Sequence, residues 1–244
     1  MNLLTPVIVM ASLGLLFGIG LAVALKIFGI KVDPAMEKIL SLLPGVNCGA
    51  CGKPGCSGFA EALRKGEVKP SQCVVSNDKA REAISRILGI ADASSIKMVA
   101  AVCCDGGKRA KDKFVYTGIK RCRAASMVFG GFKACYFGCL GLGDCVRSCP
   151  FGAITIGEDN LPVVNLEKCT ACGNCVKACP KKLIHLIPAT KPFYVKCSSK
   201  DPGAAVARVC QVGCIACGKC EKSCPEKAVK VDSFLARISY ELWK

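Results

Sequence analysis

The sequence predicts an α+β protein with one N-terminal transmembrane helix, a small loop-and-helix domain with four cysteines, and repeats in which cysteine-rich loops alternate with short strands. Three observations predict this fold class: a long uncharged apolar run near the N-terminus, 21 cysteines that gather in tight groups, and a cysteine pattern that occurs three times. The boundaries that we expect are 1–28 for the transmembrane anchor, 32–91 for the four-cysteine domain, 97–132 for a cysteine-containing connecting region, 133–232 for the repeats and 233–244 for a C-terminal tail.

The apolar run from Leu3 to Leu25, LLTPVIVMASLGLLFGIGLAVAL, has no charged residue and is long enough to cross a bilayer as a helix. A secretory signal would carry a basic residue before a shorter apolar core, whereas nothing basic precedes Leu3. Lys26 and Lys31 follow the run, so the positive-inside rule places the rest of the chain in the cytoplasm. A buried core helix is the alternative. We expect a single-pass protein of the cytoplasmic membrane, with its bulk on the cytoplasmic side.

The stretch after the anchor predicts a compact domain around four cysteines. A short amphipathic helix is expected after Pro34, and another helix over residues 78–90. Between them, NCGACGKPGCSGFAEAL places three cysteines on one glycine-rich loop, with a helical pattern directly behind it. Glycines let backbone N–H groups approach sulfur atoms closely, because they have no side chain in the way. The candidate metal ligands here are Cys48, Cys51, Cys56 and Cys73, and ADASS (91–95) is expected to be a linker.

Three runs of similar spacing occupy the second half of the chain: CYFGCLGLGDCVRSCP (135–150), CTACGNCVKACP (169–180) and CIACGKCEKSCP (214–225). The second and third read C-x2-C-x2-C-x3-C-P, the spacing by which bacterial ferredoxins bind [4Fe–4S] clusters. Structural zinc sites separate two C-x-x-C pairs by a longer insert, and disulfide scaffolds are short secreted chains with an even cysteine count. Each run is followed by a strand-like segment: FGAITI, KKLIHLI or EKAVKV. The pattern predicts iron–sulfur clusters in a bacterial-ferredoxin-like domain.

In paired runs, three cysteines of one run share a cluster with the fourth cysteine of the other run. This rule predicts one cluster held by Cys149, Cys169, Cys172 and Cys175, and a neighbouring cluster held by Cys139, Cys145 and Cys179. The neighbouring cluster lacks a ligand, because Leu142 occupies the position of the run's second cysteine. Cys135 is the nearest replacement, and we expect it to complete this site. In the alternative, Cys135 joins Cys104 and Cys122 on a further cluster and leaves the site of Cys139 to another thiolate.

The third run poses a second problem, because no fourth run follows it to supply the usual partner cysteine. Its first three cysteines, Cys214, Cys217 and Cys220, can hold three corners of a cluster. Cys197 and Cys210 are the candidates for the fourth ligand, and Cys224 also needs a partner. Either the chain is truncated after Lys244 or the remaining cysteines complete the set. We expect four clusters, and a fifth if the remaining cysteines form one.

The formal net charge of +16 and the isoelectric point of about 9.1 first suggest a nucleic-acid-binding protein. Metal-bound cysteines are thiolates, however, and four cubane clusters of charge about −2 each would offset roughly half of the excess. The remaining positive charge favours an acidic partner or an anionic membrane surface. The sequence has neither G-x-G-x-x-G nor G-x-x-x-x-G-K-[ST], so nucleotide binding by this chain is not expected.

The order of these features closely resembles the B subunit of the Rnf complexes, which are ion-translocating ferredoxin:NAD oxidoreductases. The resemblance rests on the N-terminal span, NCGACGKPGCSGFAEAL, KACYFGCLGLGDCVRSCPFGAI, CTACGNCVKACP and CQVGCIACGKCEKSCP, and it covers nearly the whole chain. It implies a subunit that takes electrons from reduced ferredoxin on the cytoplasmic face and passes them towards membrane subunits, with flavin and NAD sites on other subunits. Cys48, Cys51, Cys56 and Cys73 match the family's four-cysteine domain. Leu142 departs from the ferredoxin part, in the manner of longer, cysteine-rich members.

We therefore expect a redox subunit of a translocase, in which electrons pass from ferredoxin at the distal repeats through the 48–73 domain to the membrane. One alternative is an iron–sulfur electron-transfer subunit of another membrane oxidoreductase, such as a hydrogenase or dehydrogenase. The other is a zinc-binding protein that binds nucleic acid. The expected partners are reduced ferredoxin, the other membrane subunits and the membrane, with no nucleic acid.

Overall fold

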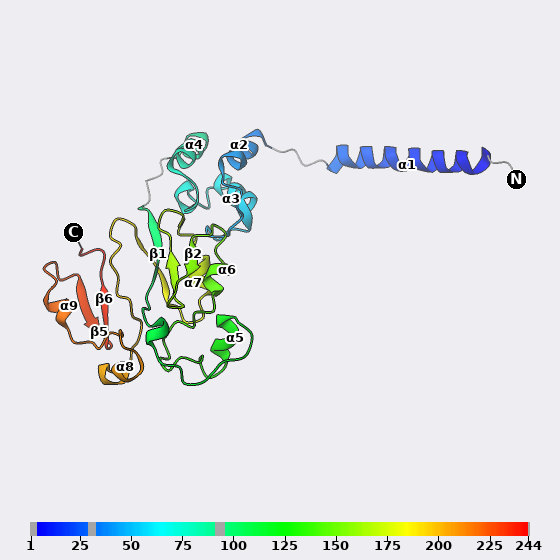
Figure 1. Cartoon of the computed structure of the whole chain (residues 1–244). Helices are drawn as coiled ribbons and strands as arrows, with labels where there is room; N and C mark the ends of the chain where they lie inside the picture. The colour runs from blue at the N-terminus through cyan, green and yellow to red at the C-terminus, as the bar shows by residue number, and fades with distance from the viewer. Residues whose placement is uncertain (1–3, 29–32, 91–95, 244) are drawn as a thin grey trace.

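The computed structural model describes residues 4–28, 33–90 and 96–243 (Figure 1). α1 (Leu4–Phe28) is a helix of 25 residues that lies apart from the rest of the molecule. Its segment Pro6–Ile27 is long and apolar enough to cross a membrane, and none of its most apolar window is buried. A helix that exposes apolar side chains on all sides is the kind that lipid surrounds. The expected linker at 91–95 lies outside the described residues.

The domain after α1 packs three helices together: α2 (Pro34–Leu42), α3 (Gly55–Arg64) and α4 (Asp78–Leu88), with the short 3-10 helix η1 (Pro70–Gln72) before α4. Side-chain caps start α2 and α4, since Asp33 accepts a hydrogen bond from Ala35 N–H and Asn77 accepts one from Ala80 N–H. The buried core between the helices includes Ile39, Phe59, Leu63 and Ile84. This core holds the cysteine loop between α2 and α3.

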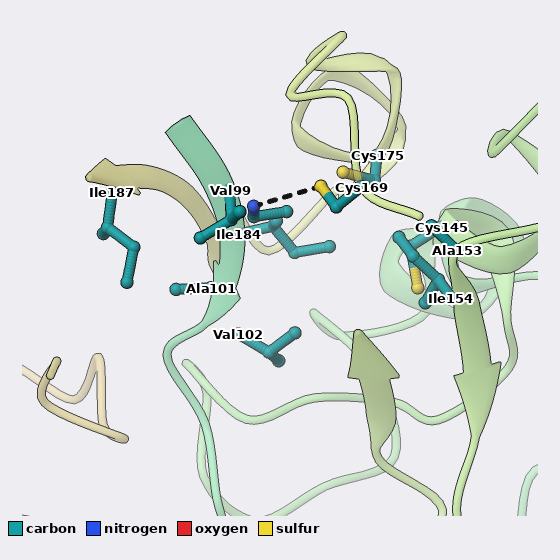
Figure 2. Close-up of a cluster of buried hydrophobic side chains, with 11 residues drawn as sticks. Val99, Ala101, Val102, Cys145, Ala153, Ile154, Cys169, Cys175, Ile184 and Ile187 are labelled. Carbon is teal, nitrogen blue, oxygen red and sulfur yellow. Dashed lines mark hydrogen bonds between the residues drawn. The ribbon is translucent and has the colours of Figure 1, made fainter. Parts of the chain in front are cut away.

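The central body contains two antiparallel strand pairs, β1 (Met98–Val102) with β4 (Ile184–Pro188) and β2 (Ile154–Ile156) with β3 (Pro162–Val164). The short helices α6 (Asp144–Arg147) and α7 (Asn174–Ala178) lie in the first and second cysteine runs. Each begins after a glycine with left-handed backbone, Gly143 (φ 76°) or Gly173 (φ 75°), a conformation that side chains disfavour. Buried residues of both strand pairs and both runs form one core (Figure 2).

The connecting region 97–132 contributes more structure than the sequence predicts. Its apolar segment MVAAV forms β1, which is buried along most of its length against the central body. The 3-10 helix η2 (Gly107–Arg109) and helix α5 (Cys122–Met127) follow. Through β1, the region shares the core of the first two runs.

The third run adds α8 (Gly203–Val209), α9 (Lys219–Lys222) and the hairpin of β5 (Val229–Asp232) and β6 (Leu235–Ile238). β6 lies in the segment that the sequence analysis separated as a tail. With β2, β4 and β5, the strand-like segment after each run forms a strand, and the described residues form three two-stranded antiparallel sheets. This mixture of helices and antiparallel ribbons confirms the predicted α+β class. Figure 1 places α2–α4 at one end of the molecule and α5 and α8 at the opposite end.

Candidate metal centres

Twelve of the 21 cysteines line three cavities in the described part of the chain, with four cysteines in each. No three Cys, His, Asp or Glu side chains among the described residues lie close enough together to hold a single metal ion. A cubane distributes its thiolate ligands over four irons, so these ligands lie farther apart than those of one zinc ion. The spacing of the cysteines therefore fits a cluster better than a single ion. We number the sites from the α2–α4 domain outward.

Site I consists of Cys48, Cys51, Cys56 and Cys73, in the α2–α4 domain. Asn47 fixes the loop, because its side-chain oxygen accepts a hydrogen bond from the backbone N–H of Cys56 at 2.7 Å. Gly55 has φ +83°, and a Cβ there would lie 2.8 Å from that same oxygen, so only glycine suits this turn. Burial raises the pKa of Cys73, and the nearby thiolates of Cys51 and Cys56 raise it further. Cys73 also packs in the same core as Cys51 and Cys56, so it lies beside the loop.

Site II is the cavity lined by Cys149, Cys169, Cys172 and Cys175, the set that the pairing rule predicts. Two backbone N–H groups point at its sulfur atoms. Ala100 of β1 donates to Cys169 Sγ (Figure 2) and Ala153 donates to Cys149 Sγ, each at 3.4 Å. Burial, followed by the neighbouring thiolates, raises the pKa of Cys175 to about 12. A metal centre would displace the proton and compensate the buried charge.

Site III is the cavity lined by Cys122, Cys139, Cys145 and Cys179. Cys122, the first residue of α5, occupies the place that we expected Cys135 to fill. The Cys122 sulfur accepts hydrogen bonds from the backbone N–H groups of Asp144 and Leu142, although burial still raises its pKa overall. Its sulfur therefore lies beside Leu142, the residue that stands where the run's second cysteine would be. Cys122 compensates for that leucine from a different segment of the chain.

Asp144 positions Cys122 by tying α5 to the first run. Its buried carboxylate accepts a hydrogen bond from the backbone N–H of Arg123 at 2.9 Å and forms an ion pair with Arg121 at 3.1 Å. Burial opposes its ionisation, but the hydrogen bonds and the charges of Arg121 and Arg147 lower the pKa of Asp144 overall. The two residues on either side of Cys122 are thus held by one ionised carboxylate. No motif in the sequence marks this role.

Site IV is the cavity lined by Cys104, Cys135, Cys197 and Cys210, which come from four separate segments. The backbone around residues 110–112 brings them together: Ala110 forms an antiparallel bridge with Cys210, and Ala134 N–H donates to Lys111 O at 2.8 Å. Ser199 N–H approaches Cys197 Sγ at 3.5 Å. Burial, and then the thiolates of the other three cysteines, raise the pKa of Cys135 to about 11.

Site IV corrects two expectations. The expectation that Cys135 completes the site of Cys139 is wrong, because the pairing of residues 133–134 with 111–112 turns Cys135 towards Cys104. The alternative grouped Cys135 with Cys104 and Cys122, and the structure brings together only the first two. Cys197 and Cys210, the candidate partners of the third run, also lie in site IV.

The third run lies outside these cavities. Its cysteines line none of the three, and Cys217 and Cys220 are exposed to solvent, whereas Cys214 and Cys224 are half-buried. Cys103, which follows β1 directly, faces a surface groove instead of site IV.

The four sites form a row. Cys139 N–H of site III donates to Cys104 Sγ of site IV at 3.4 Å. Cys145 of site III and Cys175 of site II lie in the same buried core. Burial raises the pKa of Cys172 of site II, and the nearby thiolate of Cys48 in site I raises it further, so these two sites are also neighbours. The row therefore runs from site IV through sites III and II to site I.

Comparisons with known proteins agree with this division. A family model for an Fe–S cluster domain matches residues 43–75, which contain site I, and one for a 4Fe-4S dicluster domain matches residues 133–183, which contain the first two runs. Neither covers Cys104, Cys122, Cys197 or Cys210.

The chain is also similar over nearly its whole length to curated proteins. It is 42% identical over 240 residues (98% of this chain, 72% of the relative) to the B subunit of the Na+-translocating ferredoxin:NAD+ oxidoreductase complex of Acetobacterium woodii. It is 41% identical over 240 residues (98% and 91%) to the B subunit of the ion-translocating oxidoreductase complex of Methanosarcina acetivorans. The B subunit of the proton-translocating ferredoxin:NAD+ oxidoreductase complex of Clostridium ljungdahlii is 42% identical over 237 residues (96% and 84%).

Proposed function

The chain belongs to the B subunits of ion-translocating oxidoreductase complexes, and on that basis we propose that it carries electrons from reduced ferredoxin to the membrane partners of such a complex. The names of two relatives, ferredoxin:NAD+ oxidoreductases, support ferredoxin as the electron donor. NAD+ and flavin are expected on other subunits, because this chain has no dinucleotide-binding motif.

The observation that carries the proposal is the row of four cysteine sites. Electron transfer between redox centres weakens steeply with distance, so a row of sites in contact with one another can act as a relay. Site IV touches site III through the Cys139 N–H bond to Cys104, and site II approaches site I through Cys172 and Cys48. The row ends in the α2–α4 domain, which follows α1 along the chain. This order supports transfer from site IV towards the membrane.

We propose that each site holds one [4Fe–4S] cluster through the four cysteines that define it. These ligands are Cys48, Cys51, Cys56 and Cys73 in site I, Cys149, Cys169, Cys172 and Cys175 in site II, Cys122, Cys139, Cys145 and Cys179 in site III, and Cys104, Cys135, Cys197 and Cys210 in site IV. The third run would hold a fifth cluster at three corners through Cys214, Cys217 and Cys220, and Cys224 is the remaining thiol of that run. The fifth cluster would lie beside the row.

When bound, a [4Fe–4S] cluster supplies one-electron redox chemistry at these sites. The chain orients and tunes the thiolates: Ala100, Ala153 and Leu183 donate backbone N–H bonds to sulfur atoms of sites II and III at 3.4 Å. Such bonds favour the thiolate over the thiol and shift the potential of a cluster. Apolar residues such as Ile154 and Ile184 line the cavities and limit the access of water.

We propose that α1 anchors the chain and that the cluster domains lie on the cytoplasmic side. Lys26 and Lys31 follow the apolar segment and support this orientation. A reducing cytoplasm also keeps unligated thiols from forming disulfides while clusters are inserted.

Site III offers the most direct test, because the sequence itself suggests a rescue. The full chain with Cys122→Ser, expressed in its complex and purified without air, should lose about four irons per chain. It should also lose most of the ferredoxin-dependent reduction of NAD+, since one interruption stops a relay in series. Adding Leu142→Cys to that variant should restore both, because the Cys122 sulfur lies beside the backbone of Leu142.

Cys103→Ser is the matched control. Cys103 lies one residue from a ligand of site IV but lines none of the three cysteine cavities, so its loss should leave the iron content unchanged. Full iron in Cys122→Ser would overturn the ligand set of site III. Loss of iron with undiminished activity would overturn the relay through that site.

A further inference from the structure

A groove of about 730 Å³ lies between the central body and the β5–β6 hairpin. We call it the β4–β6 groove, because residues of both β4 and β6 line it. Tyr136 and Tyr194 also line it. A hollow of this size on a protein surface is large enough to receive a projecting loop or several side chains of a partner.

The groove is positively charged throughout. Lys181, Lys182, Lys200 and Arg237 line it, whereas no Asp or Glu does. None of these four side chains forms an ion pair with a carboxylate in the described part of the chain. Lys182, Lys200 and Arg237 are exposed, so their charges are available to a partner. Such a concave surface with charges of one sign attracts a ligand of the opposite sign and accelerates its association.

The groove also shares its walls with two of the cysteine sites. Phe137, Cys197 and Ser198 line both the groove and the cavity of site IV. Pro180 and Lys181 line both the groove and the cavity of site III. A molecule seated in the groove is therefore separated from these sites by single residues.

Aromatic side chains give the groove an apolar surface as well. Tyr136 is 61% exposed, and Lys181 Nζ lies 4.3 Å from the centre of its ring, so the ring is already held in position. Tyr240 is fixed by its hydroxyl, which donates to Phe193 O at 2.8 Å. Tyrosine and arginine are enriched among the residues that contribute most to binding in protein–protein interfaces, whereas lysines typically lie in the polar rim.

On the basis of the proposed function, we propose that the β4–β6 groove is the docking site of an acidic, soluble iron–sulfur protein that donates electrons to this chain. In the docked complex a cluster bound at site IV or site III would accept one electron from the reduced donor, so that the donor is oxidised by one electron and the cluster is reduced by one electron. No proton or further reactant is needed. The groove adjoins sites III and IV, the two sites that are farthest from site I along the row, so the donated electron would enter the relay at the end away from the α2–α4 domain.

A small anion such as a nucleotide is the competing occupant. The groove offers it positive charge and aromatic rings, but the described residues that line it include neither a glycine-rich phosphate loop nor the start of a long helix. The walls shared with sites III and IV instead favour a partner that exchanges electrons.

The experiment reverses the charge of the groove in the intact complex. The variant Lys182→Glu, Lys200→Glu, Arg237→Glu should raise the KM for reduced ferredoxin by about tenfold at low salt and weaken the dependence of the rate on salt. Its rate with a small artificial reductant should stay unchanged, because the clusters and their ligands are intact. A matched control with the same change of net charge, Lys38→Glu, Lys69→Glu, Lys79→Glu, alters exposed lysines of the α2–α4 domain and should leave the KM unchanged.

Each other outcome overturns a different statement. An equal rise of KM in both variants would show that only net charge matters, and an unchanged KM in the groove variant would exclude the groove; the proposed function would stand in either case. A wild-type complex that accepts electrons from the artificial reductant but not from ferredoxin would instead refute the proposed function. Inhibition of ferredoxin binding by a free mononucleotide, lost in the groove variant, would assign the groove to a small anion.

Discussion

In the second cysteine run, the alanine before the second cysteine has φ 58° at Ala171, and in the third run the equivalent Ala216 has φ 56°. The glycine before the short helix has φ 75° at Gly173 and 71° at Gly218. The two loops therefore have nearly the same backbone as well as nearly the same sequence. Local sequence determines the shape of a cysteine run, because these positive φ values recur wherever the spacing recurs.

The surroundings of the two loops differ. Cys169 and Cys175 are 8% and 7% exposed, whereas Cys217 and Cys220 of the third run are exposed. The second run is covered by β1, whose Ala100 donates to a sulfur atom, and by the first run, which supplies the fourth cysteine. The third run has no equivalent cover from the described residues. The run thus shapes three corners of a site, and a partner segment completes and buries it.

The largest expected difference between the runs is in stability. Cys175→Ser should lose the cluster of site II, and the free energy of unfolding should fall by more than about 2 kcal/mol, because Cys175 lies in the central core. The equivalent Cys220→Ser should lose the fifth cluster but lower the free energy of unfolding by less than Cys175→Ser, because its side chain is exposed and lies outside the central core. Anaerobic thermal unfolding of the full chain measures both. Equal destabilisation by the two substitutions would mean that the third run is buried in solution as well.

A smaller difference is expected in the rate at which clusters are lost. Brief exposure to air with a chelator should release about four of roughly twenty irons in a fast phase, because the third run is the exposed one. Cys217→Ser should abolish the fast phase, and the equivalent Cys172→Ser in the second run should retain it. Iron release followed by absorbance resolves the two phases. A single phase in the wild-type chain would contradict the contrast between the runs.

The sequence predicts those parts of the sites that depend on the local spacing of the cysteines. The α+β class, the family and the grouping of Cys149 with the second run follow from the run itself, because its spacing dictates both the loop and the exchange of the fourth cysteine. Leu142 also indicated that another cysteine must complete site III, and Cys122 lines the cavity of that site.

The identity of that cysteine depends on tertiary contacts that no spacing encodes. Cys122 reaches site III because the Asp144 carboxylate holds the residues on either side of it. Cys135 is closer in sequence to Cys139, but the backbone pairing of residues 110–112 turns it towards site IV. The sequence held one further signal: Cys104 and Cys122 lie outside the three runs and the 48–73 domain, so they had been assigned to no other site. Proximity along the chain was the wrong criterion for choosing the fourth cysteine of site III.

The smallest expected effects come from the two equivalent glycines. A Cβ added at Gly173 or Gly218 would meet no atom within 4 Å, so substitution by alanine costs only the strain of a left-handed backbone, about 1 kcal/mol at either position. In Gly173→Ala this cost should appear as a fall of about 2–4 °C in the midpoint of thermal unfolding, because the loop is part of the central core. In Gly218→Ala the same cost should instead accelerate the fast phase of iron loss by about fivefold, because it favours opening of an exposed loop.

A fall of the same size in the unfolding midpoint of both variants, with no change in the fast phase, would show that the two loops unfold together. Because the backbone cost is the same at Gly173 and Gly218 and an added Cβ meets no atom at either position, the two variants differ only in the surroundings of their loops.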